Sequence, residues 1–428
     1  MLIKSSFLLS KSGFELASKP AGRPFGMRNL NLLVVSSPYP IVNYGGVFVK
    51  DQVNSMKGEF SSINVVAPMS YFPKFLFAVD RFRDYTRFSS FPVDYSFGNV
   101  NVYFAKHMPL PTLKVFSKIR VFQSSAAVNR LVRHLRIRFN LVHSHFLLPE
   151  GYIGASLKEE YHVPFVVTAH GGDIYSQPFV DNWWREKTKY VLVKADCVIT
   201  TSMRNSGIIE EQFGIDKKKI RVIGNGFDPD SFFPICRRTA RQALGLPLEG
   251  RIVLSVGNLL KIKGHRYLIE AMKEICSKFN DVSCVIIGEG YEKAALKARI
   301  VEFDLEARIR LIGGVSHDRI PLWLNSSDVF VLPSLDEGFP TVVAEALGCG
   351  RPVVASAVGG VPEAILDEGL GILVPPRDVD RLAAGITSAL TRGWDESRIA
   401  EYARDKYTWK KMASKVLKVY SEVLTGFE

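Results

Sequence analysis

The feature that most constrains the fold is an alternation of short apolar runs and helical patterns that occurs twice along the chain. Seven such runs precede residue 224 and six follow residue 234. Short apolar strands separated by helices are typical of a parallel sheet that helices cover on both faces. The runs lie at residues 32–35, 63–66, 100–104, 141–145, 165–168, 197–200 and 220–223, then at 251–256, 282–287, 309–312, 329–332, 352–355 and 371–374.

The stretch between the two series, residues 224–234, is rich in Gly, Asn and Pro and predicts a domain boundary. A chain of 428 residues is also longer than one ordinary core needs. We therefore expect an α/β protein with two doubly wound domains, at residues 27–228 and 229–408. Ligands of such sheets bind beyond the carboxyl ends of the strands. Residues 409–424 carry apolar side chains at helical spacing and predict a final helix.

The ends and the composition narrow the class of protein. Residues 1–26 lack the apolar core and the cleavage site of a signal peptide, so we expect a disordered extension. No apolar run is long enough to span a bilayer. Five scattered cysteines without a C-x-x-C pair predict neither a zinc site nor a disulfide framework. This usage fits a reducing, cytoplasmic compartment.

Positive charge is concentrated in the first half of the chain. Residues 1–230 hold 29 of the 55 Lys and Arg residues but only 18 of the 43 Asp and Glu residues. No acidic residue occurs from Tyr95 to Pro149, and basic and apolar residues alternate there. This pattern favours an anionic membrane surface, with a solvated helix face as the alternative. Nucleic acid fits less well, because no aromatic stacking motif accompanies the charges.

Two carboxylates, Glu337 and Glu345, flank a Gly-Phe-Pro break between an apolar run and a helical pattern. This order predicts a strand, a tight loop and a helix start, where proline is well tolerated. The free backbone N–H groups at such a helix start favour a phosphate. The carboxylates could act as acid and base, as metal ligands, as acceptors for hydroxyl groups, or as solvated helix glutamates. A phosphorylated, hydroxyl-rich ligand could be held by both.

Further candidates follow predicted strands. Lys263 precedes a glycine and could neutralise a diphosphate, or could be an ordinary loop lysine. His170, in the run 168–173, could bind a hydroxyl or orient a second substrate, or could be a packed histidine near a turn. His145, at the end of another run, is a weaker candidate. Gly45 and Gly46 would let the backbone approach a ligand closely, with a plain turn as the alternative.

Several of these segments together resemble one family. Glu337-Gly338-Phe339-Pro340 with Glu345 resembles the paired-glutamate signature of the retaining glycosyltransferases of family 4. Residues 257–264 resemble that family's diphosphate-binding loop, and 348–355 and 359–363 resemble the block after its signature. The histidine run and the Gly-Gly pair also have counterparts in the family. The resemblance extends from about residue 29 to residue 423.

The resemblance implies a GT-B fold, in which two Rossmann-like domains face each other across a cleft. It implies that no metal or other cofactor is needed, and that the final helix, at 409–428, packs back on the first domain. Glu345 would accept hydrogen bonds from the nucleotide ribose, and Glu337 from the donor sugar. Lys263 would bind the diphosphate and His170 would contact the donor sugar. The remaining donor-binding residues would be Gly45, Gly46, Asn258, Gly313, Val315, Gly338, Phe339, Pro340, Thr341 and Val342.

One position departs from the family pattern. Many members have an arginine where this chain has Asn258. Asparagine cannot supply a positive charge to the diphosphate. Either Lys261 supplies the missing charge, or Lys263 is the only cation at the diphosphate.

We therefore predict a cytoplasmic, metal-independent glycosyltransferase, bound peripherally to a membrane through its basic domain. It would move a sugar from a nucleotide-sugar donor to a glycan or a lipid-linked acceptor in cell-surface polysaccharide or glycolipid synthesis. The first domain would hold the acceptor and the second domain the donor. Two alternatives stay open: a nucleotide-sugar epimerase of similar fold, and a non-catalytic protein that binds nucleotides or polyanions.

Overall fold

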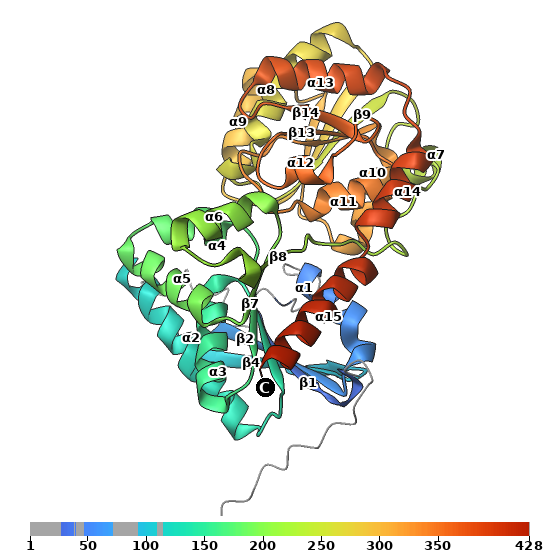
Figure 1. The fold of residues 1–428 in the computed structure, drawn as a ribbon. Helices are drawn as coiled ribbons and strands as arrows, with labels where there is room; N and C mark the ends of the chain where they lie inside the picture. The colour runs from blue at the N-terminus through green and yellow to red at the C-terminus, as the bar shows by residue number, and fades with distance from the viewer. Residues whose placement is uncertain (1–26, 38, 40–46, 72–92, 109–113, 428) are drawn as a thin grey trace, which may run out of the picture.

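The computed structural model describes residues 27–37, 39, 47–71, 93–108 and 114–427. Residues 1–26, Gly45 and Gly46 lie outside these ranges. Within them the chain forms two parallel sheets, one from each half of the sequence, with helices on both faces (Figure 1). The α/β fold expected from the alternation of apolar runs and helical patterns is confirmed.

Among the described residues, the sheet of the first half has eight strands in the order β3-β4-β2-β1-β5-β6-β7-β8. Its strands are β1 (Asn31–Val35), β2 (Ser62–Ser70), β3 (Tyr95–Phe97), β4 (Val100–His107), β5 (Leu141–His145), β6 (Phe165–Ala169), β7 (Cys197–Thr200) and β8 (Ile220–Val222). In the part of this sheet that the structure describes, only β3 is antiparallel, to the neighbouring β4. This three-residue edge strand was not predicted, because it is too short to show a period.

The sheet of the second half has six strands in the order β11-β10-β9-β12-β13-β14. Its strands are β9 (Arg251–Val256), β10 (Val282–Ile287), β11 (Ile309–Gly313), β12 (Val329–Leu332), β13 (Val353–Ser356) and β14 (Gly371–Val374). All of its neighbouring strands pair in parallel.

The apolar runs are continuous because both faces of each sheet are covered. In β1, Leu33 and Val35 pack into one core of the first domain, while Leu32 and Val34 pack into the other. β2 is five residues longer than its predicted apolar run and contains Pro68. Strand β1 pairs with β2 only as far as Val66, so the missing N–H of this proline leaves no gap in that ladder.

Helices connect the strands in both halves. In the first half they are α1 (Val47–Met56), α2 (Lys114–His134), α3 (Tyr152–Tyr161), α4 (Gly172–Tyr175), α5 (Asn182–Lys194) and α6 (Met203–Phe213). In the second half they are α7 (Arg237–Leu244), α8 (His265–Lys278), α9 (Lys293–Glu302), α10 (Ile320–Ser326), α11 (Thr341–Gly348), α12 (Val361–Ala364), α13 (Val379–Thr391), α14 (Glu396–Lys406) and α15 (Trp409–Gly426). No helix of the described residues is both long and apolar enough to cross a bilayer.

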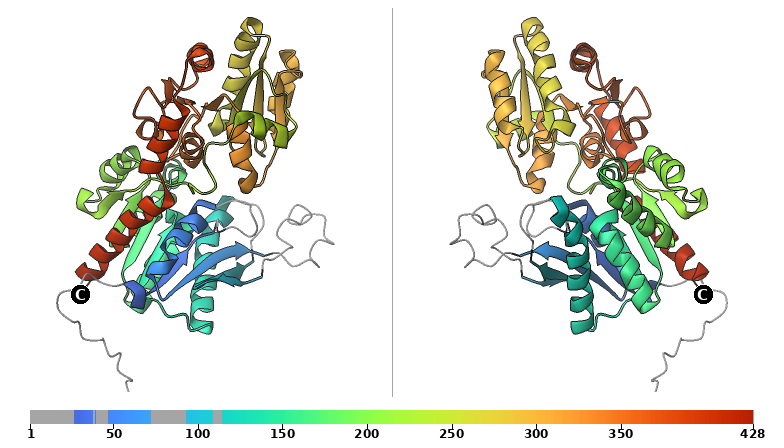
Figure 2. Two further views of the ribbon diagram at one scale, coloured as in Figure 1. Left: turned by 90° about the vertical axis from the view of Figure 1, so that its right-hand side faces the viewer. Right: turned by 90° about the vertical axis from the view of Figure 1, so that its left-hand side faces the viewer.

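The last helix, α15, runs from the second domain down along the first (Figures 1 and 2). It packs against α1, and its Trp409, Met412, Val416 and Tyr420 are buried in a core of the first domain. The chain leaves the first domain at Phe227 and returns beside it at Thr408, where the two residues form an isolated parallel bridge. The domain limits predicted at residues 228 and 408 stay a prediction.

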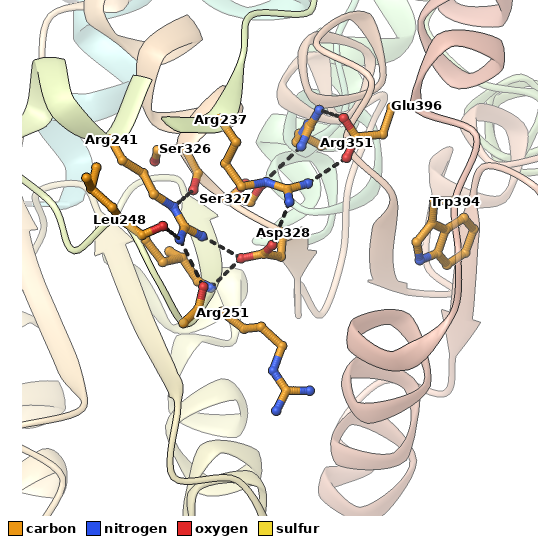
Figure 3. Close-up of polar contacts among 12 residues, drawn as sticks. Arg237, Arg241, Leu248, Arg251, Ser326, Ser327, Asp328, Arg351, Trp394 and Glu396 are labelled. Carbon is orange, nitrogen blue, oxygen red and sulfur yellow. Dashed lines mark hydrogen bonds and ion pairs between the residues drawn. The ribbon is translucent and has the colours of Figure 1, made fainter. Parts of the chain in front are cut away.

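A partly buried network of charges joins helices α7 and α14 of the second domain to the start of β12 (Figure 3). Asp328, just before β12, accepts from Arg241 at 2.8 Å and pairs with Arg237 at 3.1 Å. Arg237 also pairs with Glu396, which in turn binds the fully buried Arg351. Arg351 belongs to the segment 348–355 that resembles the family's block, and in this structure it joins α11 to α14 rather than facing a ligand.

Candidate active site

Two polar loops meet where the strand order of the second domain reverses. The order β11-β10-β9-β12-β13-β14 places the first and fourth strands of the domain side by side. The crevice beyond such a switch point is where open α/β sheets bind ligands. The loop after β9 and the loop after β12 are joined by a hydrogen bond from Leu335 N to Ile262 O, at 2.7 Å. Gly264 has a φ of +67°, and a Cβ there would overlap the carbonyl oxygen of Pro333.

These two loops pair Lys263 with Glu337. The Nζ atom of Lys263, at the end of the short helix η8 (Lys261–Lys263), lies 2.7 Å from Oε1 of Glu337. Ser334 Oγ donates to the same oxygen at 2.6 Å. Glu337 is 7% exposed, so this carboxylate is held in place by a cation and a hydroxyl group. The two residues were predicted separately, and the fold brings them together.

Glu345 lies in the second turn of α11 and binds a histidine that the sequence did not single out. His317 Nε2 lies 2.9 Å from Oε1 of Glu345. Burial lowers the pKa of His317, but the hydrogen bond and the charge of Glu345, with those of Asp51 and Asp318, outweigh it and raise the pKa. The one available signal was its place two residues after Val315, one of the predicted donor-binding residues.

Helix α1 of the first domain faces this pair. A cavity of about 160 Å³ is lined by Lys50 and Asp51 on one side and by His317 and Asp318 on the other. Burial raises the pKa of Asp51 to about 6, His317 opposes the rise, and Glu345 adds to it. Charged groups of both domains therefore share the space around Glu345.

The predicted glutamate loop touches the predicted histidine turn across the domains. A Cβ on Gly338 would overlap the carbonyl oxygen of His170, so this approach requires glycine. On either side of the contact, Arg204 pairs with Asp336, and the backbone N–H of Met203 donates to Glu363 at 2.8 Å. The loop that carries Glu337 is thus fixed against the first domain by backbone contact and by charge.

His170 is half-buried among aromatic rings. Its centroid lies 4.9 Å from that of Phe48 and 4.6 Å from that of Phe146, and its Nε2 lies 3.1 Å from Nδ1 of His145. Burial lowers the pKa of His170 to about 3, so the ring is neutral at pH 7. Asp173 does not orient this ring, because its carboxylate accepts the backbone N–H groups of His170, Gly171 and Leu147.

A cavity of about 520 Å³ opens in the first domain next to this turn. Gly172 and Asp173 form part of its wall, and Glu150, His107 and Arg120 line it as well. Glu150 is buried and accepts the backbone N–H of Ser37 at 3.2 Å. Burial raises the pKa of Glu150 and lowers that of His107 to about 4. Carboxyl, imidazole and guanidinium groups therefore border one space beside His170.

Two further predicted residues anchor the glutamate loop with their side chains. The ring of Phe339 packs against Gly224 and lies 5.7 Å from that of Tyr407. Thr341 Oγ1 accepts from Asn225 Nδ2 at 3.1 Å. Both side chains face the connections between the domains, so only their backbone is left for a ligand. Pro340 is the N-cap residue of α11.

The other predicted donor-binding residues are spread around the crevice. Asn258 is exposed in the loop after β9, and its carbonyl accepts from Leu260 N at 2.8 Å. Gly313 ends β11 with a φ of +89°, and Val315 packs against the core of the second domain. Gly45 and Gly46 lie outside the described residues. Nowhere in the described ranges do three His, Cys, Asp or Glu side chains converge to hold a metal ion.

Two doubly wound domains that meet through the loops at their strand ends are the GT-B arrangement of glycosyltransferases. Residues 237–406 match the family described as glycosyl transferases group 1, and residues 86–231 match glycosyltransferase family 4. An uncharacterized glycosyltransferase of Methanocaldococcus jannaschii is 30% identical over 298 residues, which cover 66% of this chain and 75% of that protein. The chain therefore belongs to the family 4 (group 1) glycosyltransferases.

Other relatives match over a smaller share of their length or with lower identity. The D-inositol 3-phosphate glycosyltransferase of Mycobacterium tuberculosis is 29% identical over 67% of this chain and 62% of that enzyme. Sucrose-phosphate synthase from Thermosynechococcus elongatus superposes with a TM-score of 0.78 at 22% identity, over 93% of this chain and all of that one. Anabaena HepE in complex with UDP-glucose superposes with a TM-score of 0.70 at 20% identity, over 92% of this chain and all of that one. These two solved structures share the fold.

Proposed function

We propose that this protein transfers a sugar from a nucleoside diphosphate sugar to a hydroxyl group of a glycan or lipid-linked acceptor, with retention at the anomeric carbon and without a metal. The observation that carries the proposal is the Lys263–Glu337 pair at the switch point of the second domain, facing His170 of the first. Glu337 offers an oxygen to sugar hydroxyls, and Lys263 supplies the cation that a diphosphate needs. Glu345 is the second carboxylate, for the ribose.

The reaction that we propose takes place on one face of the sugar. The acceptor hydroxyl oxygen bonds to the anomeric carbon as the bond from that carbon to the diphosphate oxygen breaks, on the same face of the sugar. The hydroxyl proton passes to the leaving phosphate. Lys263 offsets the charge that builds on the nucleoside diphosphate. The cavity beside His170 supports an acceptor site in the first domain, and Anabaena HepE, crystallised with UDP-glucose, supports a uridine donor.

Binding of UDP is the first test of the donor site. UDP at a hundred times its dissociation constant is expected to stabilise the native protein by about 2.7 kcal/mol, read as a rise in melting temperature. Glu345→Gln is expected to lose most of that rise, because the ribose loses an ionised acceptor. The matched control is Glu302→Gln, an exposed glutamate on α9. An undiminished rise in Glu345→Gln would place the nucleotide elsewhere.

Product analysis then separates transfer from epimerisation. UDP-glucose incubated with the protein and a glycan acceptor is expected to give a glycosylated product with the anomeric configuration of the donor. Incubation without acceptor is expected to return the donor sugar unchanged apart from slow hydrolysis. An epimer of the donor formed without acceptor would contradict the transferase.

We also propose that the basic face of the first domain binds an anionic membrane surface. Helix α2 exposes Arg120, Phe122 and Arg130, and the turn that follows it exposes Arg136. Phe122 contacts Trp183 of α5, and Lys187 lies over the same phenylalanine ring at 5.7 Å. Basic groups beside exposed aromatic rings suit the headgroup region of a bilayer.

Vesicle binding tests this surface. Replacing both Arg130 and Arg136 by glutamine is expected to weaken binding to phosphatidylglycerol vesicles by about 2 kcal/mol, or roughly 30-fold, since each basic group contributes about 1 kcal/mol. The charge-matched control is the same change at the exposed Lys410 and Lys415 of α15. Binding should fall as salt is raised. Equal binding to neutral phosphatidylcholine vesicles would contradict the proposal.

A further inference from the structure

Three histidine rings form a row from the last helix to the crevice. His143 and His145 are two residues apart on β5, so their side chains lie on the same face of the sheet. His170 follows β6, the neighbouring strand. The ring centroids of His143 and His145 are 4.4 Å apart, and those of His145 and His170 are 5.3 Å apart. Only His170, at the end of this row, reaches the contact with Gly338.

The inner end of the row is fixed by hydrogen bonds. His143 Nδ1 lies 2.6 Å from the hydroxyl oxygen of Tyr420 on α15, and its Nε2 lies 2.7 Å from Oγ1 of Thr168. Both ring nitrogens of this fully buried histidine are therefore bonded. The His143 ring gives His145 a rigid surface on which to stack.

The outer end leaves two nitrogens open. His145 Nδ1 and His170 Nε2 are 3.1 Å apart and share one proton. His145 Nε2 and His170 Nδ1 are both buried and find no hydrogen-bond partner among the described residues. Burial lowers the pKa of both histidines, so each neutral ring carries a single proton. Whichever ring donates, one N–H group and one bare nitrogen are left over.

The surroundings decide between the two arrangements. If His170 donated, the unpaired N–H would be on Nε2 of His145, which is 1% exposed and enclosed by the sheet. If His145 donates, the unpaired N–H is on Nδ1 of His170, an atom that is also buried but belongs to the one partly exposed ring of the three. An N–H group buried without a partner is costly, and of the two rings only His170 has part of its surface open to a substrate whose oxygen would satisfy that group.

We propose that His145 is a positioning residue that donates from Nδ1 to Nε2 of His170 and thereby holds His170 as a neutral hydrogen-bond donor through Nδ1–H. This inference rests on the proposed transferase. The partner of Nδ1–H is a sugar oxygen of the bound substrates. His170 is then not a general base, because its free nitrogen already carries a proton, and the acceptor proton leaves with the phosphate.

Nitrogen NMR of the full-length protein, labelled in its histidine rings, tests the tautomer directly. His170→Asn identifies the signals of that ring. At pH 7, the nitrogen chemical shifts of His170 are expected to be those of a protonated Nδ1 and an unprotonated Nε2. A protonated Nε2 with a bare Nδ1 would overturn the proposal. This outcome does not depend on whether any sugar is transferred.

Activity supplies the second measurement. His145→Leu removes the donor and is expected to lower kcat about tenfold, the cost of about one hydrogen bond. His145→Asn, whose side-chain amide can donate from nearly the position of Nδ1, is expected to restore most of that loss. The rise in melting temperature with UDP is expected to be the same in all three proteins, because the Glu345 site is untouched.

The outcomes are distinguishable. If kcat falls equally in the asparagine and leucine variants while their melting temperatures stay at the wild-type value, His145 acts through packing alone and the positioning role is overturned. An unchanged kcat in both variants would overturn it as well. Absence of UDP binding in the wild-type protein would instead contradict the proposed function. If the leucine variant does not fold, the NMR result decides.

Discussion

Replacing Lys263 with alanine is expected to lower kcat by about 10²- to 10³-fold, or ~3–4 kcal/mol, because the leaving diphosphate loses its fixed positive charge. Lys263 is the cation that the fold sets at the switch point, 2.7 Å from Glu337. Steady-state kinetics with UDP-glucose measure the effect. A smaller loss of UDP affinity is expected alongside it, since the charge on the diphosphate grows in the transition state.

Lys261→Ala is the matched control. Lys261 belongs to the same short helix η8 and carries the same charge, but it is exposed and forms no ion pair within the described ranges. Its replacement is expected to change kcat less than threefold. The comparison also shows which lysine supplies the positive charge that many family members have in an arginine at the position of Asn258. A larger loss from Lys261→Ala than from Lys263→Ala would assign the diphosphate to Lys261.

The Lys263 variant also leaves Glu337 buried without its cation. This effect has to be separated from the loss of positive charge at the diphosphate. The double variant Lys263→Ala with Glu337→Ala does so. If the two residues act only through the donor, their losses multiply. If much of the loss in Lys263→Ala comes from a displaced Glu337, the double variant is expected to lose far less than the product of the single losses. Unchanged turnover in every variant would show that the proposed site is wrong.

Arg241→Met is expected to lower the free energy of unfolding by about 3–5 kcal/mol, because it breaks a buried ion pair from one side. Arg241 is 2% exposed and donates to Asp328, and to the carbonyl oxygens of Ser326, Leu248 and Gly250 (Figure 3). Methionine fills much of the space but supplies no donor to any of these oxygens. Denaturant unfolding, followed for the second domain, measures the loss.

The neighbouring arginine is the control for that prediction. Arg238 lies on the same helix α7 but is exposed, and it pairs at 3.8 Å with Glu249, which is more exposed still. Arg238→Met is expected to change stability by less than about 0.5 kcal/mol. An equal effect at both positions would show that helix α7, rather than the buried network around Asp328, determines the loss.

Much of the site could be predicted because its residues follow strands. In a parallel sheet the loops after the strands gather at one edge, so Lys263 and Glu337 were expected at that edge of the second sheet and His170 at that edge of the first. Glu345 was expected in the helix that follows the loop of Glu337. These expectations need only the alternation of apolar runs and the direction of the chain.

The partners of these residues could not be predicted in the same way. His317 is 28 residues from Glu345, and no periodic pattern connects them. The Arg204–Asp336 pair joins residues 132 positions apart on different domains. The proposed role of His145 depends on the ring of His170, which is 25 residues away and directly follows the next strand. Each contact depends on which loops the sheet order and the domain packing bring together.

The sequence by itself determined the two parallel sheets, the edge at which sheets of this kind bind ligands and the charged groups available there. It does so because burial on both faces requires apolar strands, and because polar side chains are tolerated where those strands end. Only the tertiary structure decided that Lys263 lies on Glu337, that Gly338 touches the backbone of His170 and that His170 is held by a row of histidines. Those contacts are made between loops, whose conformations follow from packing and hydrogen bonding rather than from any local pattern.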